Sequence, residues 1–586
     1  MTNTADSPAK ELREAILTGE PVRRGNGEPA EQGHSWGEER SLPASELYEL
    51  LVWPESGTTP RVAILEGLRI TGRLDLRAAD LKVPLICQGC YFDEPVNLMI
   101  ATAVEIRLIT CWLPGLAADQ LITRRDLELS RSMLGVVGLA DAHIGGRLLL
   151  SGATLSSGSY PLDLGHSSLY PRESSDHTRT EVSLVADGLK VDGNMLCEEG
   201  FSAQGEVWLP GAHIAGQLGF NSAKLGKGLT AYWLTVDRGM FCEEGFSAQG
   251  KVWLSGAHIA GHLGFEKAML GGALTADRLK VDGDMFCGKG FSAQGEVDLR
   301  GARITGQLVF LDDEAKPDKV GAFTLSLSDA HIDDGLILCV AEGFADEIDL
   351  TNARIGRLLD FECTWPQRLR LGGLVYASVR AIEDHVGTYE HGEGWREIQR
   401  WRPGRAAPDV ARRLRWIRRA EESSGNESST RGGYMPQPYT QLMAYYRKEG
   451  RDGDARRVAY ERERRRWHQL GKAGKVWNGF LRWTVGYGYR PLRALVLLLA
   501  LLSVGTVAFS HFHTAHEIIP MKAAHPPFDA IIYTLDRLTP IVSFGLRDAY
   551  APTGAAQWWA VSYALLGWAL SIAIIAGLNA AVRREN

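Results

Sequence analysis

The stretch GFSAQGEVWLPGAHIAGQL, residues 200–218, occurs three times in this chain of 586 residues. The second copy is GFSAQGKVWLSGAHIAGHL at residues 245–263, and the third is GFSAQGEVDLRGARITGQL at residues 290–308, so the period is 45 residues. A fixed period of this size is typical of a solenoid, in which each repeat buries its apolar face only by stacking on its neighbours. The sequence therefore predicts a stack of similar units.

Glycine recurs at short intervals within each copy. Apolar or small side chains fall at every second to fifth position between the glycines, as in Val207, Leu209, Ala212, Ile214 and Leu218. Helical repeats need long runs with a 3.6-residue period and few glycines, whereas short strands joined by tight turns accept many glycines. The spacing therefore favours strands over helices.

A second phrase recurs between the copies: LKVDG at residues 189–193, LTVDR at 234–238 and LKVDG at 279–283. Two phrases in each period predict two solenoid turns of about 22 residues each. We therefore expect a mainly β protein, built on a right-handed parallel β-helix solenoid and followed by an α-helical linker and a two-helix transmembrane hairpin.

The tripeptide Ala-x-Ile marks corresponding places in four turns, with the isoleucines at Ile214, Ile259, Ile304 and Ile355. This pattern resembles a degenerate pentapeptide-repeat solenoid, whose motif centres a large aliphatic residue two positions after alanine. The resemblance implies the same solenoid architecture.

The chain divides into four segments by composition. Residues 1–60 are expected to form an N-terminal arm and helical cap, residues 61–375 the β-helix, residues 376–490 a basic helical juxtamembrane region, and residues 491–586 two transmembrane helices with an outer loop. Solenoid ends need covers, because an open sheet edge invites pairing.

Shorter elements are expected within these segments. Helices are predicted at residues 7–19 and 41–53, with residues 21–40 as a linker or disordered arm. The solenoid should project loops at residues 156–180 and 312–319. Residues 438–459, with a glycine stop at Gly450, predict a helical hairpin similar to one tetratricopeptide-like unit.

Two long apolar stretches lie near the C-terminus. Residues 494–510 carry no charge, and the longer stretch 551–582 is also uncharged throughout, which predicts two membrane spans. Basic residues precede the first span, and Arg583 and Arg584 follow the second. The positive-inside rule then places both termini in the cytoplasm and the protein in the inner (plasma) membrane.

The charge is divided unevenly along the chain. Residues 181–365 contain 15 Lys and Arg against 28 Asp and Glu, whereas residues 395–493 contain 24 against 10. Basic segments beside a span attract anionic lipids. The candidate headgroup contacts are Arg456, Arg457, Arg462, Arg464, Arg465 and Arg466. A solvated helix face is the alternative, and no nucleic-acid motif accompanies the arginines.

Eight cysteines without a secretory signal predict reduced thiols. Cys197, Cys242 and Cys287 recur at the 45-residue period and should form a ladder inside the coil. The pair Cys87 and Cys90 is expected to be buried in the same way, with a redox or metal pair as the alternative.

Histidines and aspartates also recur, at His213 and His258 and at Asp192, Asp237 and Asp282. Arg303 replaces the third histidine, which argues against a metal ladder and favours turn-facing surface residues. No phosphate-binding loop, dinucleotide motif or nucleophile elbow is present. We therefore expect no catalytic residue, no metal and no cofactor.

The loop between the two predicted spans is unusual. A helical pattern at residues 528–538 precedes a segment distantly similar to the potassium-channel sequence Thr-Val-Gly-Tyr-Gly-Asp, although it keeps a single glycine. An amphipathic interfacial helix is the alternative. The residues of this pore-like loop are Thr539, Pro540, Ser543, Phe544, Gly545 and Asp548.

The whole layout resembles a bacterial, largely actinobacterial, family of membrane-anchored repeat proteins, through Pro438-Tyr439, Gly450, Asp454-Ala455-Arg456-Arg457 and Tyr487-Gly488-Tyr489-Arg490-Pro491. Its members are commonly labelled membrane-associated oxidoreductases, which implies an activity whose site the residues do not reveal. Our preferred hypothesis is a membrane-tethered cytoplasmic scaffold for an unknown protein partner. The alternatives are an oligomeric ion channel gated by the solenoid, which would make the chain a homo-oligomer, and an oxidoreductase.

Overall fold

The computed structural model describes most of the chain, in two compact units that divide it into Met1–Ser423 and Ser424–Asn586. The described residues are 8–25, 27–52, 61–159, 181–288, 290–311, 323–339, 345–360, 365–381, 410–424, 434–466, 471, 474–475, 479, 491–522, 525–539 and 542–582. Residues 160–180 of the loop predicted at 156–180, and the whole loop predicted at 312–319, lie outside them.

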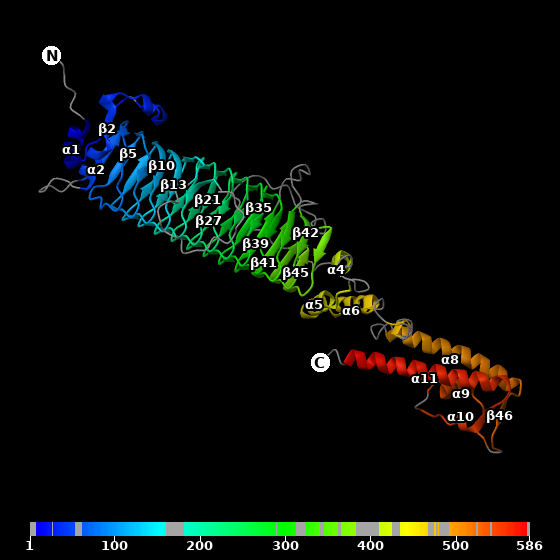
Figure 1. Ribbon diagram of the computed structural model, residues 1–586. Coiled ribbons are helices and arrows are strands. Elements are labelled where there is room, and N and C mark those ends of the chain that lie inside the picture. The colour runs from blue at the N-terminus through cyan, green and yellow to red at the C-terminus, as the bar shows by residue number, and fades with distance from the viewer. Residues whose placement is uncertain are drawn as a thin grey trace, which may run out of the picture. The chain divides into compact units, whose positions relative to one another are not determined.

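The first unit is a parallel β-solenoid of about twelve turns (Figure 1). Its strands run from β1 (Val22–Arg23) to β45 (Val375–Ala381), and they form two long sheets. A typical turn places β22 (His213–Ile214) and β23 (Leu218–Gly219) in the first sheet, then β24 (Lys224–Leu225) and β25 (Leu229–Thr230) in the second.

The strand register explains the repeat period seen in the sequence. His213 of β22 pairs with Thr235 of the next turn, and Thr235 pairs in its turn with His258, the counterpart of His213 in the second copy. The period is therefore two turns, as the two recurring phrases predict. Within each Ala-x-Ile tripeptide the outer residues are buried, as Ala212 and Ile214 show.

The corners account for the length of a turn. Successive strands within a sheet start five residues apart, as β22 and β23 do, whereas β23 and β24 of different sheets start six apart. The corner between sheets contains a residue with positive φ, such as Ser222 at 60° or Trp233 at 56°. This left-handed conformation bends the chain from one sheet to the other, and glycine adopts it without steric cost.

The interior explains why alternate turns differ. Cys197, Cys242 and Cys287 are buried as predicted, but the register places Phe220 and Phe265 between them, so the column alternates cysteine with phenylalanine. The neighbouring column alternates in the opposite phase, through Phe201, Ala223, Phe246, Ala268 and Phe291. Each of these turns thus contributes one phenylalanine and one small residue, cysteine or alanine, at these two positions, which keeps the core closely packed.

The N-terminal end is covered by α1 (Pro8–Thr18) and α2 (Ala44–Val52) (Figure 1). The expected linker at residues 21–40 is wrong, because this segment forms β1, η1 (Ala30–Ser35) and η2 (Glu38–Arg40). Gly33 of η1 lies against the ring of Tyr91. The segment is therefore packed on the first turns of the solenoid.

The C-terminal end is covered by α4 (Val410–Ser424), which the sequence did not predict as a cap. Arg413 of α4 is fully buried and forms an ion pair of 2.5 Å with Asp360 of β43 (Arg354–Asp360). The indole of Trp365 also donates to Asp360, over 3.0 Å. The last turns are thus closed by a charged anchor rather than by an apolar face alone.

The second unit begins with the predicted helical hairpin, α5 (Pro436–Lys448) and α6 (Asp452–Arg466), with Gly450 at a φ of 71° between them. The remaining elements are α8 (Pro491–Thr514), β46 (Ile518–Pro520), α9 (Ala530–Leu538), α10 (Leu546–Ala549), β47 (Tyr550–Pro552) and α11 (Ala555–Val582).

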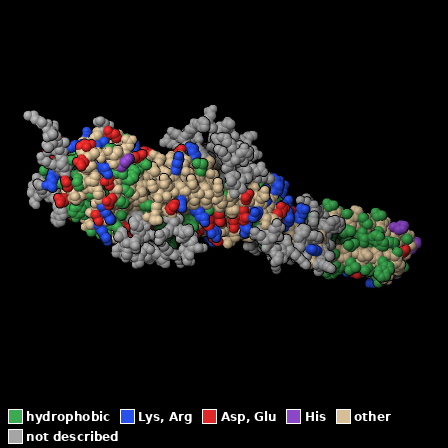
Figure 2. Space-filling view, turned by 45° about the horizontal axis from the view of Figure 1, so that its top comes forward, with side chains coloured by type: hydrophobic (Ala, Val, Ile, Leu, Met, Phe, Trp, Pro, Cys, Tyr) green, Lys and Arg blue, Asp and Glu red, His purple; other side chains and the backbone are tan. Residues whose placement is uncertain are grey.

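One helix among the described residues is long and apolar enough to cross a membrane, over Leu495–Thr514 with a mean hydropathy of 2.1. The first predicted span is thus supported, and α11, where the second was expected, stays a predicted span. Hydrophobic side chains cover much of the surface of the part of the second unit that contains α8 and α11. Histidines gather at one end of this part (Figure 2).

Candidate functional site

The short helix α9 packs against both α8 and α11. Gly505 of α8 faces Thr534 and Tyr563, and a Cβ placed on it would overlap the Thr534 methyl group. Gly567 of α11 faces the carbonyl oxygen of Leu538, which a Cβ at that position would also overlap. Small residues allow this close approach, as they do between helices in membranes. The two glycines therefore hold α9 against the two long helices.

The pore-like loop folds back onto Asp536 of α9. The carboxylate accepts the N–H of Phe544 over 2.9 Å and the N–H of Arg547 over 2.6 Å, and Asp536 is fully buried. Gly545, at a φ of 85°, is the N-cap residue that precedes α10. The loop is therefore fixed by one buried carboxylate that the sequence analysis did not single out.

The other predicted loop residues lie around this anchor. The Thr539 hydroxyl donates to the carbonyl of Leu535 over 2.8 Å and lies 3.2 Å from that of Val542, and the Ser543 hydroxyl accepts the N–H of Gly545. Asp548 is exposed and lies 3.9 Å from Arg547. Pro540 lies outside the described residues. Of the predicted loop residues, the structure thus brings Phe544 to the buried carboxylate, places Gly545 next to it in the chain with its N–H on Ser543, and leaves Asp548 at the surface.

The arginines predicted to contact lipid headgroups lie on α6, where carboxylates of the same helix engage most of them. Glu461 pairs with Arg464 and Arg465, and Glu463 pairs with Arg462 and Arg466. Arg457 pairs with Asp454, and Arg456 is exposed. Glu461 and Glu463 are buried, so a phosphate that took their arginines would leave buried carboxylates without counterions. The exposed Arg456 and Arg457 are the more accessible of the six.

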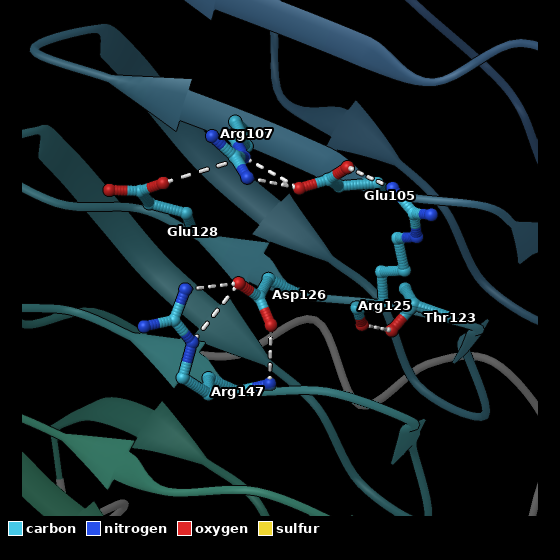
Figure 3. Close-up of polar contacts among 7 residues, drawn as sticks. All are labelled: Glu105, Arg107, Thr123, Arg125, Asp126, Glu128 and Arg147. Carbon is cyan, nitrogen blue, oxygen red and sulfur yellow. Dashed lines mark hydrogen bonds and ion pairs between the residues drawn. The ribbon is translucent and has the colours of Figure 1, made fainter.

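A dense group of charges lies on the first sheet (Figure 3). Arg107 lies 2.5 Å from Glu105 and 3.7 Å from Glu128, and Arg147 lies 2.7 Å from Asp126. Burial acts to raise the pKa of Asp126, but the hydrogen bonds from Arg147 outweigh it and the pKa is lowered. Held ionised beside the Arg147 guanidinium, Asp126 is poorly suited to general acid–base catalysis.

The sequence analysis missed this charged group because its members are distant along the chain. Glu105, Asp126 and Arg147 follow one another at intervals of one turn and therefore occupy the same corner in three successive turns. That spacing is the signal that predicts such a group once the length of a turn is known.

The recurring histidines and aspartates, expected as separate columns, meet between turns. His213 lies 3.0 Å from Asp237, and His258 lies 2.8 Å from Asp282. The hydrogen bond from His258 lowers the pKa of Asp282. Among the residues that the structure describes, no group of three or more His, Cys, Asp or Glu side chains is arranged to hold a metal ion.

A third cysteine, Cys111, lies close to Cys87 and Cys90 because it occupies the position of Cys90 in the next turn. The N–H of Cys90 donates to the sulfur of Cys111 over 3.4 Å, and all three residues are buried. Burial raises the pKa of the Cys111 thiol well above its usual value. All three thiols are enclosed in the core, out of reach of a reaction partner, so the arrangement favours a packing role over redox chemistry.

An aromatic patch on the second sheet was also missed. It consists of Trp208, Tyr232, Trp233 and Trp253, with Trp233 63% exposed and Trp253 39% exposed. Large apolar rings left in solvent are a common sign of an interaction site. The signal in the sequence is tryptophan at a strand position where neighbouring turns carry threonine.

Comparisons with protein-family models, with curated proteins and with solved structures find no match to this chain.

Proposed function

We propose that this protein is a membrane-tethered scaffold whose solenoid presents a rigid surface to a protein partner in the cytoplasm. The observation that supports it is the combination, in one chain, of a solenoid of about twelve turns with a helix apolar enough to span a membrane. A solenoid with both ends covered does not extend by edge pairing, so its outward faces remain for binding.

The proposed topology has two spans, α8 and α11, and both termini in the cytoplasm. Large apolar side chains of both helices are exposed, including Val496 at 66%, Val507 at 72% and Leu565 at 65%. Lipid contact is the environment that favours such exposure. The arginines of α6 would then bind anionic headgroups, and the solenoid would be a right-handed, pentapeptide-like β-helix.

The scaffold is tested by affinity purification of the full chain from detergent-solubilised membranes. The expected result is one protein that co-purifies at a fixed ratio and stays bound when α9 or its loop is altered. Absence of any protein at a fixed ratio, or recovery of the chain in the supernatant after ultracentrifugation of lysed cells, would contradict the proposal.

A second candidate function, an oligomeric ion channel, is favoured by the packing of α9. A short helix held against two long ones, followed by a loop fixed on Asp536, is an arrangement that can line a pore when several copies assemble. Planar-bilayer recording of the purified chain tests it. Conductance that Gly545→Ala or Thr539→Ala changes would support a channel, and a silent bilayer would exclude it.

No observation on the described residues favours the oxidoreductase activity that the family resemblance implies.

A further inference from the structure

The aromatic patch is built from three successive turns of the second sheet. Trp208 of β21 (Glu206–Trp208) and Trp253 of β29 (Val252–Trp253) both pair with Thr230 of β25, so one threonine separates the two indoles. Tyr232 lies at the next corner, with its ring 6.0 Å from that of Trp208 and 5.2 Å from that of Trp233. It is nearly perpendicular to both, at 87° and 89°. The three rings therefore meet edge to face and do not lie in a parallel stack.

Trp233 is held in place by its own turn and by the next one. Its φ of 56° is in the left-handed region, which is costly for a bulky residue. The backbone N–H of Trp233 donates to the carbonyl of Ser255. The indole ring lies over Gly256, where a Cβ would come within 2.7 Å of it. Gly211 occupies the same corner one turn earlier. An indole in this position keeps 63% of its surface exposed, so burial does not explain its presence.

Carboxylates surround the rings. Burial raises the pKa of Tyr232, and the nearby charges of Asp187 and Glu206 raise it further. Glu206 accepts a hydrogen bond from Thr230. Asp277 accepts one of 2.5 Å from Ser255 but also pairs with Arg278 over 3.3 Å, so Asp187 and Glu206 are the main negative charges at the rings. The negative potential that these groups create adds to that of the aromatic faces. The patch is therefore electrostatically suited to a cation.

One ring of the patch already contacts a cation from the same chain. The ammonium group of Lys251 lies 5.9 Å from the ring centre of Trp253, within the range of a cation–π contact. The surrounding residues 181–365 carry 28 acidic against 15 basic side chains, so a positively charged partner is attracted to this part of the solenoid.

We propose that the aromatic patch binds an arginine-bearing segment of the protein partner, with a guanidinium group stacked on the indole of Trp233. This inference rests on the proposed scaffold function and names the chemistry of its partner. Arginine is favoured over lysine because its planar group stacks on a ring while its N–H groups donate to the neighbouring carboxylates. Aromatic and arginine side chains are also those that dominate protein interfaces.

The test measures binding of a fluorescent peptide, with three arginines separated by glycines, to the full chain by anisotropy. The chain is kept in a polyoxyethylene detergent, which has neither charge nor sugar. The matched control peptide has citrulline, an uncharged analogue, at each arginine. We expect Trp233→Ala and Trp253→Ala each to weaken binding about three- to tenfold, and Glu206→Gln to reduce its dependence on salt.

Met269→Ala is the control variant, because Met269 is an apolar residue of the same sheet, 54% exposed, outside the patch. It should bind as the unaltered chain does, and circular dichroism should show every variant folded. Equal binding of the arginine and citrulline peptides, or unchanged binding in both tryptophan variants, would overturn the inference. Binding of an oligosaccharide such as cellohexaose in place of the peptide would also overturn it and assign the patch to carbohydrate.

The two proposals fail in distinguishable ways. A co-purifying partner that both tryptophan variants retain would leave the scaffold intact and remove the patch as its site. Peptide binding that needs Trp233, in a chain that neither sediments with membranes nor retains a partner, would keep the patch and remove the scaffold.

Discussion

The interior of the solenoid and the packing of α9 are stabilised in opposite ways. In the solenoid each buried ring contacts the turns above and below, as the 6.5 Å pair of Phe201 and Phe220 and the 6.2 Å pair of Phe220 and Phe246 show. In the second unit single groups, Asp536 and Gly567, determine where whole segments lie. A destabilising substitution should therefore affect only neighbouring turns in the solenoid, but should loosen the whole pore-like loop in the second unit.

The largest effect is expected from Phe220→Ala. Removing this fully buried ring should cost about 4 kcal/mol, because the turns cannot close over the cavity. Hydrogen exchange followed by mass spectrometry should show faster exchange in the turns next to Phe220 and no change near β1. Cys242→Ala, in the same column, is the matched control and should cost about 1 kcal/mol. Loss of protection along the whole solenoid would show that its turns are not independent.

The next largest effect concerns the end cap. Asp360→Asn should destabilise the cap by about 3 kcal/mol, because Arg413 would keep a buried charge without its counterion. Limited proteolysis should then cut within α4.

The double variant Asp360→Leu, Arg413→Met tests the same contact from the other side. It removes both charges and should recover most of the protection of α4, since paired burial of ions stabilises little. A double variant as sensitive as Asp360→Asn would contradict this account of the cap.

A smaller effect is expected for the anchor of the pore-like loop. Asp536→Asn should cost about 2 kcal/mol, because one amide oxygen replaces two charged acceptors for the N–H groups of Phe544 and Arg547. Labelling of a Ser543→Cys reporter by a maleimide should become faster. Asp548→Asn is the control, because the Asp548 side chain is 75% exposed, and it should leave the labelling rate unchanged.

The smallest effect depends on pH. Burial raises the pKa of Glu243 to about 7, with the charges of Glu266 and Glu244 adding to the rise. Since the folded state holds the proton more tightly than the unfolded chain, Glu243 lowers stability progressively as pH rises from about 4.5 to 7. After discounting for partial exposure, Glu243→Gln should stabilise the protein by about 1 kcal/mol at pH ~8 and have no effect at pH ~4.

Thermal unfolding at the two pH values measures this difference. Glu244→Gln is the control, because the Glu244 side chain is 61% exposed, and it should change stability by less than about 0.5 kcal/mol. An equal gain at both pH values would show that ionisation of Glu243 is not the cause.

Much of the solenoid could be predicted from the sequence, because its contacts repeat at the period of the sequence itself. The length of a turn, the buried Ala-x-Ile pattern and the helices at the N-terminal end follow from short-range patterns. The alternation of cysteine with phenylalanine does not, because it depends on which residues of successive turns pair with one another. The end cap left a weaker signal, since Arg413 falls on the same helical face as Trp416, Ile417 and Ala420.

The site in the second unit was harder to predict because the helical pattern at residues 528–538 does not show which side chains are buried. Ile531 is 55% and Ile532 41% exposed, while Thr534 and Asp536 are buried together with Tyr533 and Leu538. The proposed membrane location would favour this arrangement, because apolar side chains gain nothing by leaving lipid and polar groups turn inward to find partners. The partners of Asp536, the N–H groups of Phe544 and Arg547, lie beyond the end of α9, so the periodicity of the helix does not predict them.

The opposed phases of the Cys197 and Phe201 columns restrict how such a chain can lengthen during evolution. Inserting one turn would bring two phenylalanine rings, or two small side chains, to the same level of the core and either crowd or empty it. Duplicating a pair of turns preserves the fit. Relatives of different length should therefore differ by multiples of 45 residues in this region, and gene duplication in that unit explains why the copies are still so alike.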